Sequence, residues 1–289
     1  MQQARTPVVL VHGWKSHPGV WNHLVRRIEE ASVPYLVFDH STMKNASIAR
    51  TATALQDRIA QMRQETGYAG PVDMVCHSIG GCIARYLIEV IDQERREEQV
   101  GQVICLGPPN NGSSIAELFN DPEHGPHLLD QLAGVFVPRT YDPAADLMAQ
   151  EVRPGSRTMA ALAGAGVRKD VAYRLVLTAN LSATPAFFPW SEGKTWTLGP
   201  GGEWETTYAG DGIVSHRDSY LPGAGMDILP AGRSGLGEHP EQYCHLTLPR
   251  NPEVIARVME YLLDPATPSQ QVCQARRDQE APGNQDGER

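Results

Sequence analysis

The stretch CHSIG, residues 76–80, contains two side chains that could act as nucleophiles, Cys76 and Ser78. It lies between the apolar run VDMV, which is typical of a strand, and GCIARYLIEVI, whose apolar residues recur at helical spacing. A sharp turn from strand to helix exposes the residue at its tip, and the first amides of the helix point towards a developing oxyanion. Ser78 occupies this tip, whereas Cys76 ends the strand, where apolar packing keeps a thiol inert. The pattern predicts Ser78 as the nucleophile and Cys76 as a core residue.

A second candidate segment is HGW, residues 12–14, which directly follows the apolar run PVVLV. An acyl-transfer site needs a backbone N–H from another loop to help stabilise the oxyanion, and losing one such donor costs about a hundred- to a thousandfold in rate. The end of a strand adjacent to the nucleophile turn could supply it. We therefore expect the backbone amides of Trp14 and Ile79 to form an oxyanion hole.

A serine hydroxyl becomes a strong nucleophile only when a base takes its proton and an acid orients that base. Asp211 is the favoured acid, because the flanking Gly210 and Gly212 form a turn that lets its carboxylate project from the end of the sheet. Asp218 and Asp227, which we expect in a polar loop, are the alternatives. The candidate bases are His245, His216 and His239.

These residues need a scaffold that brings distant segments together. Short apolar runs suited to buried strands alternate with amphipathic helical runs. This alternation predicts an α/β fold with a mostly parallel central sheet and helices on both faces. The expected strands are residues 7–11, 35–38, 72–76, 102–106 and 172–179, and the last expected helix is 252–263.

The segment of about residues 113–170 interrupts this alternation and predicts an inserted helical cap or lid, within a single domain over residues 1–265. Its apolar helical face could cover an acyl-binding cleft or could simply pack the cap onto the sheet, and both interpretations stay open. Residues 266–289 are almost without apolar side chains, so we expect this tail to be disordered. The expected substrate-binding residues are His77, Leu128, Leu132, Phe136 and Phe188.

Composition excludes several classes of function. Lys and Arg number 25 against 34 Asp and Glu, a net charge of -9 without a basic block, so nucleic acid is not an expected partner. The apolar runs are far shorter than the roughly 20 residues of a membrane span.

Five cysteines without CxxC spacing favour neither a disulfide framework nor a zinc site. MQQARTP lacks an apolar signal region, so we expect a cytoplasmic protein or a secreted one whose signal was removed.

Together, the motifs resemble the bacterial lipases of the α/β-hydrolase fold. The resemblance rests on VVLVHGW, VDMVCHSIGG, LGPPNNGSS, AGDGIVS, and CHLTL with the helix that follows. It implies the chain order Ser, Asp, His for the catalytic residues and places the histidine in a loop before the last helix, which favours His245. By contrast, His216 is close in sequence to Asp211, and His239 lies beside Pro240 in an expected surface loop.

The resemblance implies a serine hydrolase, a lipase or carboxylesterase, that cleaves esters of hydrophobic acyl chains. A thioesterase or acyltransferase with the same triad is the alternative, and a noncatalytic binding protein on a hydrolase fold is a third hypothesis. We expect a small-molecule or lipid ester as substrate and a transient contact with a lipid surface. Some lipases hold a structural calcium ion, but Asp218 and Asp227 match no ligand spacing, so we expect no metal and no cofactor.

Overall fold

The computed structural model describes residues 5–231, 236–269, 271 and 272. Its central sheet has the strand order β2-β1-β3-β4-β5-β8-β9, in which the first six strands are parallel and β9 is antiparallel. The strands are β1 (Val8–Val11), β2 (Tyr35–Phe38), β3 (Val72–His77), β4 (Val100–Leu106), β5 (Ala172–Thr178), β8 (Gly225–Leu229) and β9 (Gln271–Val272). The predicted parallel sheet is confirmed, with β8 as a parallel strand that the sequence pattern did not reveal.

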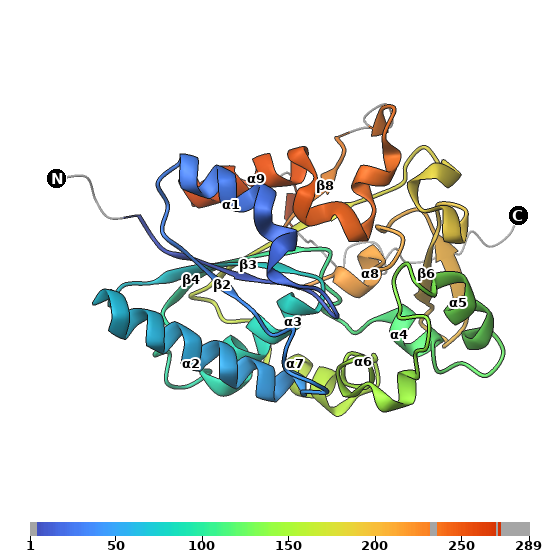
Figure 1. Cartoon of the computed structure of the whole chain (residues 1–289), viewed down its shortest axis with the longest axis horizontal. Helices are drawn as coiled ribbons and strands as arrows, with labels where there is room; N and C mark the ends of the chain where they lie inside the picture. Colours follow the sequence, from blue (N-terminus) through green and yellow to red (C-terminus); the bar gives the residue numbers. More distant parts are fainter. Residues whose placement is uncertain (1–4, 232–235, 270, 273–289) are drawn as a thin grey trace, which may run out of the picture.

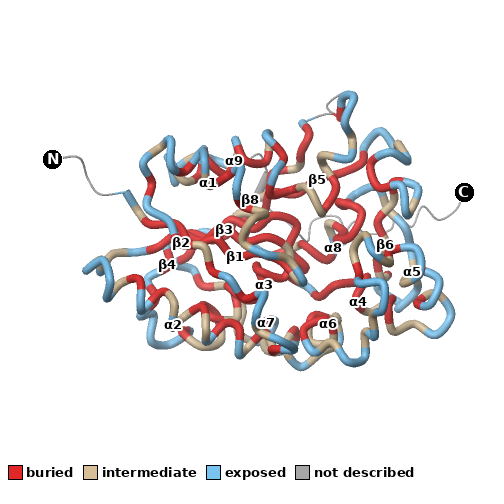
Figure 2. The backbone as a smooth tube through the Cα atoms, viewed as in Figure 1, coloured by how far each residue is buried: buried red, intermediate tan, exposed pale blue. Residues whose placement is uncertain are grey.

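Helices cover both faces of the sheet, as Figure 1 shows, with α1 and α9 on one face and α2, α3 and α7 on the other. Successive side chains of a strand point to opposite faces, so a strand covered on both sides must be apolar throughout. In β1, Val9 and Val11 pack with residues of α2 and α3, whereas Val8 and Leu10 pack with residues of α1 and α9. The helices are α1 (Asn22–Glu30), α2 (Ile48–Thr66), α3 (Ile79–Arg85), which continues as the π-helix η2 (Tyr86–Ile91), α7 (Arg157–Ala165) and α9 (Pro252–Leu263). Figure 2 shows β1, β3 and β4 as the buried centre.

Residues 113–170 lie between β4 and β5 and consist of short helices joined by loops. These are α4 (Ser114–Leu118), α5 (Gly125–Leu132), the 3₁₀ helix η3 (Pro143–Ala145), α6 (Leu147–Glu151) and α7. Leu128 and Leu132, on the predicted apolar face, are 4% and 1% exposed and lie in an apolar cluster with Ile115, Phe188 and Ile213. The apolar face of α5 therefore packs the cap onto the rest of the protein.

A second insertion, between β5 and β8, supplies the remaining short elements. It contains a two-stranded antiparallel hairpin, which lies with α4 and α5 at one end of the molecule (Figure 1). Its elements are η4 (Pro185–Phe187), η5 (Pro189–Ser191), β6 (Thr195–Leu198), β7 (Trp204–Thr207) and α8 (His216–Ser219). Further 3₁₀ helices among the described residues are η1 (Pro18–Trp21), η7 (Pro240–Tyr243) and η8 (His245–Arg250).

The expected C-terminal tail begins directly after α9. Residues 266–269, 271 and 272 of this tail are described, and β9 pairs with β8; residues 270 and 273–289 lie outside the described residues. We keep the single domain over residues 1–265 as a proposal. None of the described helices combines the length and the apolar character that crossing a bilayer requires.

Candidate active site

Ser78 stands in the sharp turn between β3 and α3. Its backbone has φ 56° and ψ −131°, a left-handed conformation that costs a non-glycine residue on the order of 1–3 kcal/mol and persists only where the surroundings enforce it. The backbone N–H of Ser78 donates to the carbonyl of Leu106 on the neighbouring strand at 2.9 Å. This hydrogen bond helps to hold the serine in its strained conformation at the tip of the turn, where the sequence pattern placed it.

Two glycines allow the chain to approach this turn closely. A Cβ on Gly80 would lie 2.5 Å from the carbonyl oxygen of Val11, so only glycine lets α3 begin this close to the end of β1. A Cβ on Gly13 would lie 3.0 Å from the Cβ of Ser78. The HGW loop and the nucleophile turn therefore lie against each other, as an oxyanion hole built from both requires.

His245 and Asp211 complete a chain of hydrogen bonds that begins at Ser78. His245 Nε2 lies 2.9 Å from Ser78 Oγ, and His245 Nδ1 lies 2.7 Å from Asp211 Oδ2. The carboxylate accepts only, so the Nδ1–H of the neutral imidazole donates to it and Nε2 is left to accept from the serine hydroxyl. The side chains of His245 and Asp211 are 2% and 3% exposed, so water competes little for this contact.

Main-chain groups fix both members of the His–Asp pair. The second carboxylate oxygen of Asp211, Oδ1, accepts from the backbone N–H groups of Ile213 at 3.0 Å and Val214 at 2.7 Å. The backbone N–H of His245 donates to the carbonyl of Asp211 at 2.8 Å. The GDGIV turn therefore orients the carboxylate through its own backbone.

The alternative acids lie elsewhere. Asp218 is buried, and burial raises its pKa to about 6 while it accepts from the backbone and hydroxyl of Ser114 at 2.9 and 2.7 Å. Asp227 lies in β8 rather than in a polar loop, and it pairs with Arg257 at 2.8 Å. The loop position expected for Asp227 is therefore wrong, because a short strand containing one buried, paired carboxylate does not stand out as apolar.

The alternative bases are also occupied elsewhere. His216 Nε2 donates to the carbonyl of Thr178 at 2.9 Å, and burial lowers the pKa of its imidazole. The side chain of His239 is 66% exposed and lies 3.3 Å from the carboxylate of Glu241. Of the candidate histidines, His245 is the one that the structure brings to Ser78.

The two expected oxyanion donors are free to bind a ligand. Within the described part of the chain, the backbone N–H groups of Trp14 and Ile79 donate to no partner, and both residues line a cavity together with Ser78. Amides that already donated to the protein could not stabilise an oxyanion.

Cys76 lies in β3 with none of its surface exposed, paired in register with Cys105. Burial raises the pKa of its thiol well above the usual value, which suppresses the thiolate that reacts as a nucleophile. Cys82 and Cys244 are also buried and free, while Cys273 lies outside the described residues.

His77, an expected substrate-binding residue, has a contact that the sequence did not indicate. Its Nε2 donates to the backbone carbonyl of His245 at 3.0 Å, and the two rings are 4.7 Å apart between centroids. Burial, together with His245, lowers the pKa of His77 well below its usual range, so this imidazole is neutral. His77 therefore holds the main chain of His245 in place.

Among the described residues, Ser78 lines two cavities. One, of about 40 Å³, has a mostly apolar lining that includes Ile79, Ile115, Phe119, Phe136 and Val152. The other, of about 290 Å³, is lined by His77, His245 and Arg250 among others, and also by Phe136. Leu128, Leu132 and Phe188 line neither, because they are buried in the apolar cluster of the cap. The structure thus gives these three residues a packing role in place of the expected substrate contact.

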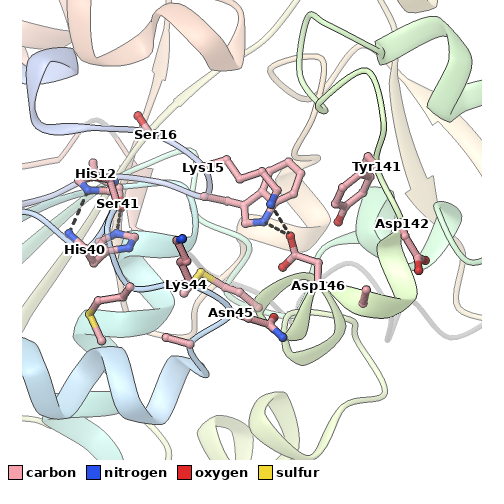
Figure 3. A pocket seen from close by; sticks show the side chains of 15 residues that line it. His12, Lys15, Ser16, His40, Ser41, Lys44, Asn45, Tyr141, Asp142 and Asp146 are labelled. Carbon is pink, nitrogen blue, oxygen red and sulfur yellow. Dashed lines mark hydrogen bonds and ion pairs between the residues drawn. The ribbon is translucent and has the colours of Figure 1, made fainter.

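A larger cavity of about 490 Å³ lies beside the HGW loop (Figure 3) and is lined by no member of the Ser78, Asp211 and His245 set. Figure 3 shows Lys15 beside Asp146 and the stacked rings of His12 and His40. The ammonium nitrogen of Lys15 lies 2.8 Å from Asp146 Oδ2. Asp146 also accepts from the Trp14 indole at 3.1 Å. This cavity adjoins the candidate site because Trp14 lines both.

Sequence reasoning missed two residues that shape the site. Gly107 follows β4 with φ +53°, and a Cβ there would lie 2.4 Å from Asp211 Oδ2 and 3.2 Å from His245 Nδ1. Only its place in LGPPNNGSS, directly after a strand, could have indicated it. Asp146, which ties the HGW loop to the cap, lies in a segment without a motif.

Described residues contain no group of three or more His, Cys, Asp or Glu side chains that could hold a metal ion. The absence of a cofactor stays an expectation.

Comparisons with known proteins agree with this architecture. The mature lipase BlEst2 of Bacillus licheniformis is 18% identical, with a TM-score of 0.63, over 90% of this chain and 93% of that one. The metagenomic carboxyl esterase MGS0156 is 16% identical, with a TM-score of 0.53, over 92% of this chain and 77% of that one. Phospholipase PlaB of Legionella pneumophila is 14% identical, with a TM-score of 0.59, over 92% of this chain and 60% of that one.

At these identities the similarity establishes the fold, and the predicted α/β-hydrolase fold is confirmed. No curated protein matches the sequence. A family model described as a domain of unknown function, DUF7379, matches residues 1–176, which contain Ser78 and the HGW loop. The chain therefore belongs to the DUF7379 family and has the α/β-hydrolase fold.

Proposed function

We propose that the protein is a serine hydrolase that cleaves carboxylic esters through an acyl-enzyme on Ser78. The observation that carries this proposal is the continuous set of hydrogen bonds from Ser78 through His245 to Asp211, at 2.9 and 2.7 Å. The strained turn at Ser78 and the backbone amides of Trp14 and Ile79, which donate to none of the described residues, support the same chemistry. The lipases and esterases among the structures of similar fold agree with it.

In the first step, Ser78 Oγ attacks the ester carbonyl while its proton passes to His245 Nε2. The carbonyl oxygen becomes an oxyanion that accepts hydrogen bonds from the amides of Trp14 and Ile79. Asp211 stabilises the imidazolium and keeps the ring in the required tautomer. The tetrahedral intermediate then collapses: the bond from carbon to the ester oxygen breaks, and the leaving alcohol takes the proton from His245 Nε2.

In the second step, water attacks the acyl-enzyme and transfers a proton to the same Nε2. The second intermediate collapses, Ser78 Oγ leaves and regains the proton, and the carboxylic acid is released. His77 supports both steps by fixing the backbone carbonyl of His245, as the 3.0 Å contact indicates.

The size of the apolar cavity bears on the acyl group. The cavity is small, with a volume of about 40 Å³. Phe136 and Val152, both from the cap segment, help to close it. We expect short acyl groups to enter with the cap in place, whereas a long hydrophobic chain requires the cap to move; contact with a lipid surface stays a prediction.

Hydrolysis of p-nitrophenyl esters from acetate to palmitate tests the proposal. We expect kcat/KM to be highest for the short esters and Ser78→Ala to lower it by about 10⁴-fold or more, as removal of a catalytic nucleophile does. Cys76→Ala is the matched control and should retain activity. An active Ser78→Ala protein would contradict the mechanism, and activity confined to thioesters would favour a thioesterase.

A further inference from the structure

The position of His245 defines where the alcohol part of an ester must lie. Because His245 Nε2 gives its proton to the leaving oxygen, that oxygen must be within hydrogen-bonding reach of the imidazole. The cavity of about 290 Å³ contains both Ser78 and His245, whereas the apolar cavity of about 40 Å³ contains Ser78 and Ile79 but not His245. The larger of the two cavities is therefore the place for the leaving group.

The charged side chains around this leaving-group cavity have one sign. Lys15 and Arg250 line it, and none of the described residues that line it is an Asp or a Glu. The chain as a whole carries a net charge of -9, so a cavity without acidic residues departs from the average character of its surface. A low-dielectric wall on one side strengthens the field of such a cluster.

Arg250 is the cation most available to a ligand. It is exposed, its guanidinium donates to the carbonyl of Leu246 at 3.3 Å, and it forms no ion pair with a described carboxylate. Lys15 is partly compensated, because its ammonium group lies 2.8 Å from Asp146. Arg250 can therefore offer its full positive charge to a ligand, whereas the charge of Lys15 is partly neutralised by Asp146.

We propose that the leaving alcohol of the natural substrate carries an anionic group, a carboxylate or a phosphate, which Arg250 binds with support from Lys15. This inference rests on the proposed ester hydrolysis and adds the substrate class. A planar guanidinium suits either anion, because its N–H groups match two oxygens at once.

Matched acetate esters test this inference. The leaving groups are 4-hydroxybenzoate, (4-hydroxyphenyl)phosphonate, neutral 4-hydroxybenzamide and cationic (4-hydroxyphenyl)trimethylammonium, and each rate is divided by that of alkaline hydrolysis of the same ester. We expect kcat/KM to be about three- to tenfold higher for the anionic esters than for the amide, mainly through KM, as one partly exposed charge pair provides. The ratio of carboxylate to phosphonate ester identifies which anion fits better. The preference should shrink as salt is added.

Two variants show whether Arg250 is responsible. Arg250→Gln should lower the anionic-to-neutral ratio about three- to fivefold, and Arg250→Glu should favour the cationic ester. Arg26→Gln, in α1, removes the same charge from an exposed position that lines neither cavity containing Ser78, and should leave the ratio unchanged. Unchanged thermal midpoints confirm that the variants fold.

Two results would overturn the inference: equal kcat/KM for anionic and neutral esters, or an equal loss of the ratio in the Arg250→Gln and Arg26→Gln proteins. A wild-type protein that hydrolyses none of the esters and forms no fluorophosphonate adduct would instead refute the proposed function itself, and with it this inference.

Discussion

The carboxyl end of the sheet, where Ser78 lies, and the cap segment are held by different kinds of contact. At the carboxyl end of the sheet, backbone groups hydrogen-bond to one another. The N–H of Ser78 donates to the Leu106 carbonyl, and the N–H of His245 donates to the Asp211 carbonyl. The cap is joined to the neighbouring loops through side chains. For example, the backbone N–H of Leu147 donates to the side-chain oxygen of Asn45 at 2.8 Å.

Two further contacts extend this pattern. The backbone N–H of Ile48 donates to the carboxylate of Glu151 at 2.6 Å, and Asp146 accepts from Trp14 and Lys15. A main-chain contact survives most substitutions, whereas a side-chain contact does not. We therefore infer that the positions of the reacting groups are fixed, while the position of the cap can vary. Substitutions at the carboxyl end of the sheet should then lower kcat strongly, and substitutions in the cap should lower it less.

The largest effect should come from Asp211→Asn. The amide cannot hold His245 in the required tautomer, so kcat should fall by about 10³- to 10⁴-fold with little change in folding. Steady-state hydrolysis of p-nitrophenyl acetate measures this.

Asp218→Asn is the matched control, because Asp218 is equally buried but contacts Ser114 of the cap. It should lower thermal stability while kcat changes by less than about tenfold. A folded Asp218→Asn protein with the same loss of kcat as Asp211→Asn would remove the distinction between the two regions.

Gly107→Ala should have the next largest effect. The new Cβ would lie 2.4 Å from Asp211 Oδ2, so the carboxylate must shift away from His245. A displacement of this order in a catalytic group costs about 100-fold in kcat.

Gly166→Ala separates this clash from backbone strain. Gly166 has φ +69°, and a Cβ added there would have no atom within 4 Å, so alanine adds only the conformational cost, on the order of 1–3 kcal/mol. Thermal unfolding and kcat are measured for both proteins. Loss of kcat in both would mean that strain, rather than contact with Asp211, explains the result.

Asp146→Ala should have the smallest effect of the three. It removes the acceptor of the Trp14 indole and the partner of Lys15, so the loop that carries the Trp14 amide loses its tie to the cap. We expect kcat for p-nitrophenyl acetate to fall about tenfold with little change in KM, because a misplaced oxyanion donor acts in the transition state.

Asp142→Ala is the control for Asp146→Ala. Asp142 lines the same cavity, but its carboxylate accepts from the backbone of Ala144 within the cap. The kcat of the Asp142→Ala protein should stay within about twofold of the wild-type value, as for surface substitutions of small energetic effect. Equal effects of the two substitutions would show that the cap as a whole, and not its tie to Trp14, sets the rate.

The sequence revealed the parts of the site that depend on local pattern. The apolar strand and amphipathic helix around Ser78, and the glycines around Asp211, are properties of short segments, so the predicted strands 35–38 and 72–76 and the final helix agree with the structure within a residue or two. The short strand β8 was missed because Asp227 interrupts its apolar pattern, and that carboxylate is satisfied by Arg257 on α9.

The parts that were missed depend on contacts between distant segments. Gly107 is required by the carboxylate of Asp211, and Asp146 acts on Trp14, so neither constraint is visible in the neighbouring residues. The apolar residues Leu128 and Leu132 form a helical stripe whether they face a substrate or a core. Only the packing of the cap decides between the two.

Labelling with a fluorophosphonate, followed by peptide mass mapping, tests the role of Ser78 most directly. We expect one adduct, on Ser78, which persists in Cys76→Ala, disappears in Ser78→Ala and forms much more slowly in Asp211→Asn. An adduct on Cys76, or one that forms at the wild-type rate in the Ser78→Ala protein, would contradict the proposed mechanism.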